Sequence, residues 1–235
     1  MKVGLIAAGL GERLRRAGIT QPKPLVPVAG QPLIDYVLGA AAAAGLREIA
    51  CIVNEESSGI EAHCQARWPD LSFDFVRRTT PSSMESLFTL SPFLTGGAFV
   101  LLTADAIFRP NALREFLDAA GEHADAQGIL AVNAFVDDEK PLWARLEADG
   151  LIAALGLPAA GSGLVTAGFY VFDPIIFGEI EASRRLRLRA LREFLGHLLA
   201  RGYTFRGVRV PKTVDVDRPA DIAVAEAFIR GGFRE

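Results

Sequence analysis

The chain has 235 residues, of which 50% are apolar and 23% are charged, a composition typical of a compact globular domain and not of a disordered or fibrous chain. Its 25 basic and 28 acidic residues are interspersed and leave a net charge of −3, so we expect no nucleic-acid partner. No apolar stretch approaches the ~20 residues of a membrane span, and the short N-terminal apolar run is better explained as a buried strand than as a signal peptide, so we expect a cytoplasmic protein with no membrane partner.

Over the first 135 residues, short apolar runs alternate with segments of helical periodicity. We expect strands over residues 2–7, 49–53, 73–76, 99–103 and 128–134, and helices over 33–44, from Ser82 onward and over 110–120. Ser82 and Glu85 have the spacing of a capping box, and Pro110 suits a first helical turn. This alternation of strands and helices predicts a mostly parallel sheet with helices on both faces.

After residue 135 the pattern changes. Strand-like runs over 142–147, 151–155 and 165–172 follow one another, and turn residues such as those at 148–150 separate them. We interpret residues 136–175, approximately, as an antiparallel lobe inserted into a single domain that spans residues 1–235. A helix over 187–200, a strand near 208–210 and a helix over 219–229 are expected to complete the fold.

A glycine-containing turn follows the first strand. Gly9 and Gly11 come directly after it and Arg13 adds a positive charge, so backbone N–H groups there could approach a phosphate. A dinucleotide-binding turn would need a third glycine at Leu14 and an acidic residue near Asn54, and the chain has neither. The turn by itself is compatible with another kind of phosphate site or with a plain tight turn.

Lys23 lies in a segment that prolines make rigid. Four prolines occur between residues 21 and 33, and lysine occurs only four times in the whole chain. Because proline restricts the backbone, this segment can fix the position of the Lys23 ammonium. A proline-rich surface loop is the alternative interpretation.

Together, residues 7–14 and 22–33 resemble the nucleotidylyltransferase superfamily that makes activated sugars, whose usual signature is LAAGxGxRL followed by PKPL. The resemblance implies a three-layer α/β/α, Rossmann-like, mostly parallel sheet, with the inserted lobe binding the acceptor. It also implies Mg²⁺-dependent transfer of a nucleoside monophosphate from a nucleoside triphosphate (NTP) to a phosphorylated sugar or polyol, with release of pyrophosphate. Glu12 departs from the family pattern, which often has Thr or Ser there.

Two aspartates match the metal ligands of that family. Asp105 follows the strand over 99–103 and resembles the family's strand-ending Gly-Asp, with Ala104 in place of glycine. Asp215 resembles the first acid of the W-x-D-x-D-T-P-x-D-L element, in which Thr213 replaces the aromatic residue and Arg218 the threonine. The resemblance therefore implies Asp105 and Asp215 as Mg²⁺ ligands. Asp217 is the alternative to Asp215 as the second ligand, but capping of the final helix also explains it, and for Asp221 we expect a place in the first turn of that helix.

The resemblance assigns roles to further residues. Arg13 and Lys23 would act with Asp105 in catalysis, because they would hold the triphosphate and the departing pyrophosphate. Residues expected at the nucleotide are Ala7, Ala8, Gly9, Gly11, Ser82 and Ser86. Residues expected at the acceptor are Glu147, Gly168 and Lys212, although the strand around Gly168 could equally be an ordinary core strand.

The base and the acceptor stay open at this level. Residues 22–38 resemble uridylyl- and guanylyltransferases, whereas residues 82–88 resemble the N-x-x-S-L element of cytidylyltransferases, so CTP and UTP are favoured. The expected partners are an NTP and a phosphorylated small molecule. A catalytically silent nucleotide-binding module is the alternative, because Glu12, Ala104 and Thr213 alter the motifs.

Overall fold

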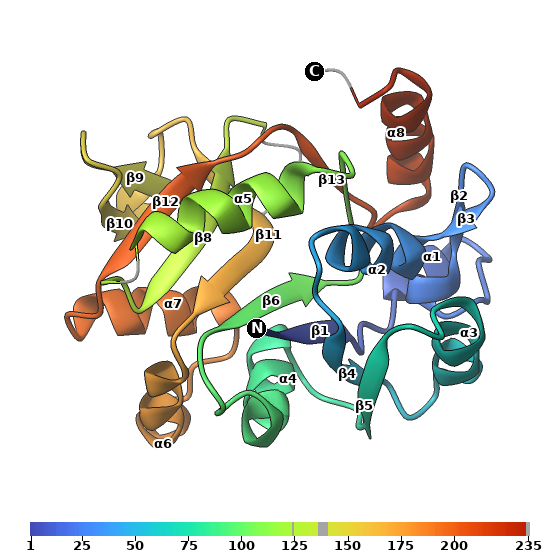
Figure 1. Ribbon diagram of the computed structural model, residues 1–235, viewed down its shortest axis with the longest axis horizontal. Coiled ribbons are helices and arrows are strands. Elements are labelled where there is room, and N and C mark those ends of the chain that lie inside the picture. Colours follow the sequence, from blue (N-terminus) through green and yellow to red (C-terminus); the bar gives the residue numbers. More distant parts are fainter. Residues whose placement is uncertain (124, 136–140, 234–235) are drawn as a thin grey trace.

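The computed structural model describes residues 1–123, 125–135 and 141–233 (Figure 1). Its centre is a seven-stranded sheet in the order β12-β8-β11-β6-β1-β4-β5. The strands are β1 (Lys2–Ala7), β4 (Glu48–Val53), β5 (Ser72–Arg77), β6 (Phe99–Thr103), β8 (Gly128–Asn133), β11 (Val165–Phe172) and β12 (Phe205–Arg209). Only β11 runs antiparallel to its neighbours, so the predicted mostly parallel sheet is confirmed.

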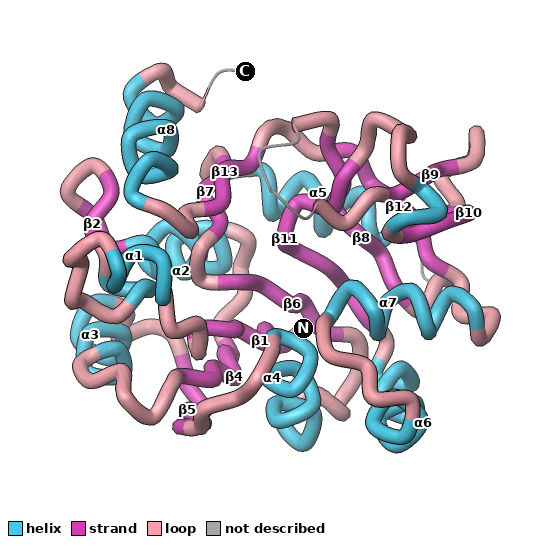
Figure 2. The backbone as a smooth tube through the Cα atoms, turned by 180° about the vertical axis from the view of Figure 1, so that it is seen from behind, coloured by secondary structure: helices cyan, strands magenta, loops and turns pink. Residues whose placement is uncertain are grey.

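Helices cover both faces of the sheet. They are α1 (Glu12–Arg16), α2 (Leu33–Ala43), α3 (Ile60–Arg67), α4 (Ser83–Leu90), α5 (Ala112–Ala120), α6 (Ile180–Arg185), α7 (Leu191–Ala200) and α8 (Pro219–Arg230). Figure 1 shows α2 and α5 across one face, and Figure 2, from behind, shows α4 and α7 across the other. Each face has its own apolar cluster, which explains why β1, β4 and β6 are apolar along nearly their whole length.

The predicted lobe needs a correction. Its last strand, β11, lies in the central sheet between β8 and β6, because Phe169 and Phe172 on it are both fully buried. Among the described strands of the predicted lobe, only β9 (Ala144–Leu146) and β10 (Ile152–Leu155) form a sheet separate from the central one. Residues 136–140, at the start of the predicted lobe, lie outside the described residues.

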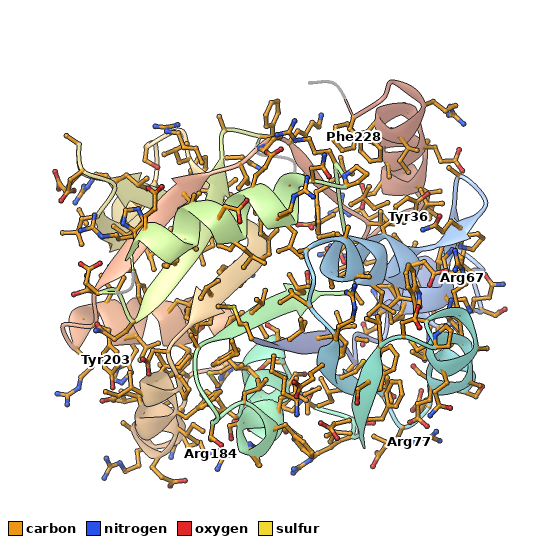
Figure 3. All side chains as sticks on the ribbon, in the orientation of Figure 1. Tyr36, Arg67, Arg77, Arg184, Tyr203 and Phe228 are labelled. Atoms are coloured by element: carbon orange, nitrogen blue, oxygen red, sulfur yellow. The ribbon has the colours of Figure 1, made fainter. Side chains whose placement is uncertain are left out.

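A third apolar cluster joins segments that are far apart in the sequence. It contains Leu14 of α1, Val28 of the hairpin β2 (Pro27–Val28) and β3 (Gln31–Pro32), and residues of β7 (Ala106–Phe108), β13 (Thr213–Asp215) and α8. Tyr36 and Phe228, labelled in Figure 3, belong to it as well. The Tyr36 hydroxyl also donates a hydrogen bond to the Val28 carbonyl at 2.8 Å. This cluster thus attaches the proline-rich segment to the strand that carries Asp215.

Within the described ranges, no helix is both long enough and apolar enough to cross a membrane.

Candidate active site

A cavity of about 640 Å³ opens where β6 ends. Its walls come from α1, β6, β11 and β13 and from the first residues of α7 and α8. Five residues selected from the sequence line it, namely Arg13, Asp105, Gly168, Lys212 and Asp215. The end of a strand in an open α/β sheet is where such folds bind their ligands.

The glycine turn lies between β1 and α1. Ala7 and Ala8 are buried, so only their backbone could face a ligand, whereas Gly9 is exposed and open space surrounds it. Gly11 adopts φ +60°, and a Cβ atom there would lie 2.9 Å from Cβ of Lys23. Gly11 is therefore required for two reasons, its left-handed backbone and the close packing of the Lys23 stem.

Lys23 begins the 3₁₀ turn η1 (Lys23–Leu25) and has only 8% of its side chain exposed. Its Nζ atom lies 2.7 Å from Oδ2 of Asp105 and 2.5 Å from Oδ1 of Asp217. Burial alone would lower the pKa of Lys23, but the two carboxylates outweigh it and raise that pKa above its ordinary value. Burial would likewise raise the pKa of Asp105, but Lys23 outweighs it and lowers that pKa. The Lys23 ammonium and the Asp105 carboxylate are therefore both charged at neutral pH.

Asp217 differs from its predicted role as a helix cap. The N-cap position of α8 is occupied by Arg218, while the Asp217 carboxylate binds Lys23 and lies 3.8 Å from Nη1 of Arg13. Asp221 lies in the first turn as expected, and its Oδ2 atom accepts hydrogen bonds from the backbone N–H groups of Asp217 and Arg218. The sequence could have indicated that Asp217 lies on the same side of the chain as Asp215. The two residues are two positions apart, and side chains at that spacing point the same way from an extended backbone.

Asp215 is brought to Asp105 by backbone pairing. β13 pairs with β7, which places Asp215 opposite Ala106, and the Val216 N–H donates to the Asp105 carbonyl at 3.0 Å. Burial, together with the negative charges of Asp215 and Asp105, raises the pKa of the nearby Tyr170 to about 12. Both carboxylates are thus close to the same phenol.

These oxygen donors fit Mg²⁺. In the part of the chain that the structure describes, no group of three or more potential His, Cys, Asp or Glu ligands occurs. Asp105 and Asp215 would therefore form a partial site, as is usual for Mg²⁺ held by one or two carboxylates with phosphate and water completing the shell.

Of the three residues predicted at the acceptor, Gly168 and Lys212 line the cavity and Glu147 does not. Gly168 has φ +83° beside a register shift in β11 and faces Thr103 and Asp215, so it lines the cavity. Lys212 lines it too, with Nζ 5.3 Å from the ring centre of Phe135. Arg192, in the first turn of α7, is a lining residue that the sequence analysis missed, and we find no local pattern that would have identified it.

Glu147 lies elsewhere. It lines a separate hollow of about 530 Å³ together with Arg145, Ser162 and Arg209. Its backbone N–H closes the turn between β9 and β10 by donating to the Leu151 carbonyl at 2.8 Å. The small sheet packs on β12, where a Cβ atom at Gly207 would lie 2.6 Å from Leu146, and this packing keeps Glu147 out of the central cavity.

The two predicted nucleotide-binding serines have structural partners. Ser82 caps α4, as predicted, by accepting a hydrogen bond from the Glu85 N–H at 3.3 Å. Ser86 is buried and shares a 2.6 Å hydrogen bond with Thr80. The residue of this segment that lines the cavity is Ser83, which the sequence analysis had not selected.

Known proteins resemble this chain in sequence and in fold. Residues 3–167 match the family described as the MobA-like NTP transferase domain. The chain is 31% identical over 157 residues to CMP-5'-(3-aminopropyl)phosphonate synthase of Streptomyces rubellomurinus, a match that covers 58% of this chain and 24% of that protein. It is also 28% identical to N-acetylmuramate alpha-1-phosphate uridylyltransferase of Neisseria meningitidis, over 80% of this chain and 82% of that protein. The chain thus spans about a quarter of the length of the first of these relatives and most of the second.

Solved structures share the fold. The inositol-1-phosphate CTP transferase of T. maritima superposes with a TM-score of 0.83 at 18% identity, over 100% of this chain and 98% of that one. A UDP-glucose pyrophosphorylase in complex with UDP-glucose superposes with a TM-score of 0.77 at 18% identity, over 98% of both chains. At these identities the likeness establishes the three-layer fold alone.

Proposed function

The chain belongs to the MobA-like NTP transferase domain family, and from this premise we propose that it transfers a nucleoside monophosphate from an NTP to the phosphate of a sugar or polyol, with release of pyrophosphate. The observation that carries the proposal is that Arg13, Asp105 and Asp215 line one cavity, where the Lys23 ammonium is hydrogen-bonded to Asp105. These residues come from four separate segments of the chain. A fold that only needed to bury apolar surface would gain nothing by gathering such charges.

The reaction needs charge neutralisation more than proton transfer. The second pKa of a phosphate monoester is about 6, so the acceptor is already mostly a dianion at pH 7 and needs no general base. Its oxygen attacks the α-phosphorus of the NTP, and the bond from that phosphorus to the pyrophosphate oxygen breaks. In this proposal Arg13 and Lys23 hold the triphosphate and the departing pyrophosphate, while the backbone of Gly9 and Gly11 lines the nucleotide.

Asp105 and Asp215 would hold Mg²⁺. When bound, the metal would neutralise phosphate charge and polarise the α-phosphate. The chain's own contribution is the fixed relation between the two acids, because the pairing of β7 with β13 sets the positions of both.

Gly168 and Lys212 are proposed at the acceptor, and Arg192 joins them as a second cation. Glu147 is left out because it lines the separate hollow. For the base, we propose a pyrimidine, with CTP ahead of UTP. Two relatives support this order, since one is named for a CMP product and one solved neighbour is named a CTP transferase.

The test is a pyrophosphate-release assay with Mg²⁺, crossing CTP, UTP, GTP, ATP and dTTP with sugar 1-phosphates, inositol phosphate, phosphocholine and aminoethylphosphonate. Release from one pair, lost in Asp105→Ala, is the expected result. A triphosphate that binds while no pair reacts would favour the silent-module alternative.

The residues that raised that alternative have ordinary surroundings. Glu12 is exposed and pairs with Arg16 at 3.2 Å, the Ala104 N–H continues the pairing to β1, and the Thr213 hydroxyl accepts a hydrogen bond from Asn133 at 3.2 Å. None of these contacts involves Arg13, Lys23 or Asp105.

A further inference from the structure

We propose that Asp217 is a positioning residue that anchors the Lys23 ammonium beside Asp105, so that Lys23 occupies this metal-binding carboxylate until a triphosphate draws it away. This inference rests on the proposed function. It assigns to Lys23 a second role, as a counter-ion that disfavours metal binding before the nucleotide arrives.

The Lys23 ammonium lies between two carboxylates. The Lys23 ammonium has three N–H donors, and it donates to Oδ2 of Asp105 at 2.7 Å and to Oδ1 of Asp217 at 2.5 Å. With 8% of its side chain exposed, Lys23 would be costly to bury as a single charge, and the two carboxylates offset that cost. A cation at Asp105 would then meet the positive charge of Lys23 at close range.

The backbone and the first side-chain atoms of Lys23 have little freedom to move. Pro22 and Pro24 restrict the backbone on both sides of it, and the close approach of Gly11 to its Cβ atom fixes the base of the side chain. Only the ammonium end can move. Because its present partners carry two negative charges, a ligand that draws it away must be at least as strongly anionic, and a triphosphate meets this condition.

Backbone hydrogen bonds hold the segment that contains Asp217. The Asp217 N–H donates to Asp221 at 2.8 Å, and the neighbouring Val216 N–H donates to the Asp105 carbonyl at 3.0 Å. The backbone of Asp217 is therefore held in place relative to Asp105 by bonds that do not involve Lys23. Arg13, 3.8 Å away, is held at the same carboxylate.

The experiment measures Mn²⁺ affinity of the nucleotide-free full chain by the electron paramagnetic resonance signal of free Mn²⁺, in the absence of any turnover. We expect Lys23→Met to raise the affinity at least about tenfold over the unmodified protein. Lys2→Met is the matched control, since it removes the same charge from a lysine whose Nζ atom pairs with Asp74 at 2.6 Å, and a rise of less than about threefold is expected. Equal effects of the two variants, or no rise in Lys23→Met, would overturn the proposal. Lys23→Gln serves as a second variant if Lys23→Met does not fold.

The role of Asp217 is tested in the Lys23→Met background. There, Asp105→Asn should lower Mn²⁺ affinity at least about tenfold, and Asp217→Asn should change it less than about threefold. An equal loss in both would make Asp217 a metal ligand and not an anchor. With Lys23 intact, Asp217→Asn should lower kcat about tenfold while Asp217→Glu recovers most of it, because a longer carboxylate can still hold the ammonium.

Failure of this inference and failure of the proposed function are distinguishable. An unmodified protein that releases no pyrophosphate from any substrate pair would reject the function, whereas the Mn²⁺ titrations need no substrate and would still measure the competition at Asp105.

Discussion

The proposed function assigns the site a phosphate end, around Lys23 and Asp105, and an acceptor end, around Lys212, and these two regions carry positive charge in different ways. At the proposed phosphate end, Lys23 is buried, and two carboxylates and the close packing of Gly11 against its side chain fix its position. At the acceptor end, Lys212 is half-buried and lies over the ring of Phe135, and Arg192 is exposed on the first turn of α7. Lys23 is held by several rigid segments, which suits a reaction step that every substrate undergoes. Lys212 and Arg192 are less constrained, which suits residues that select the acceptor.

The largest effect is expected at the phosphate end. Asp105→Ala should lower kcat at least about 1,000-fold, because it removes a proposed metal ligand and one of the two carboxylate partners of Lys23. Pyrophosphate release measures the loss, and circular dichroism checks that the variant is folded. Retention of more than a tenth of the activity would mean that this carboxylate does not take part in the reaction.

A second way to sharpen the comparison is to disturb the position of Lys23 without removing a charge. Gly11→Ala should lower the free energy of unfolding by about 2 to 3 kcal/mol, since alanine is strained at φ +60° and its Cβ atom would meet Lys23 at 2.9 Å. Activity should fall about tenfold or more. Gly9→Ala is the matched control for stability, because a Cβ atom there meets nothing within 4 Å. Similar denaturant midpoints for the two variants would contradict this account.

A smaller and more selective effect is expected at the acceptor end. Lys212→Met should raise the KM for the phosphorylated acceptor about tenfold, the usual contribution of one charge-assisted hydrogen bond. The KM for the NTP should change less than about twofold. Steady-state kinetics with each substrate varied in turn separates the two values, and an increase confined to the NTP would place Lys212 at the wrong end of the cavity.

The smallest effect is expected outside the cavity. Glu147→Gln should change kcat/KM for the acceptor less than about twofold, because Glu147 lines the separate hollow and not the cavity that Asp105 lines. A tenfold or larger loss in the same kinetic assay would show that Glu147 affects the reaction, and would restore the acceptor-binding role first expected for it.

Local structure was largely determined by the sequence. The strands over residues 2–7 and 99–103 match β1 and β6, and Ser82 caps α4 as its spacing with Glu85 predicted. Periodicity and capping depend on residues two to four positions apart, so they can be recognised without knowledge of the fold. The motifs around Gly9, Gly11, Lys23 and Asp105 identified the family for the same reason, because each is a short local pattern.

Tertiary structure alone decided which distant residues meet. From the sequence, β11 groups with the inserted lobe because it follows two other strand-like runs, but strand order placed it inside the central sheet. Lys23 reaches Asp105 across 82 positions of the sequence and Asp217 across 194, and both contacts depend on the pairing of β7 with β13 and on the third apolar cluster. The packing of β9 and β10 on β12 removed Glu147 from the site in the same way. Strand order and packing are properties of the whole sheet, and no short segment of the chain encodes them.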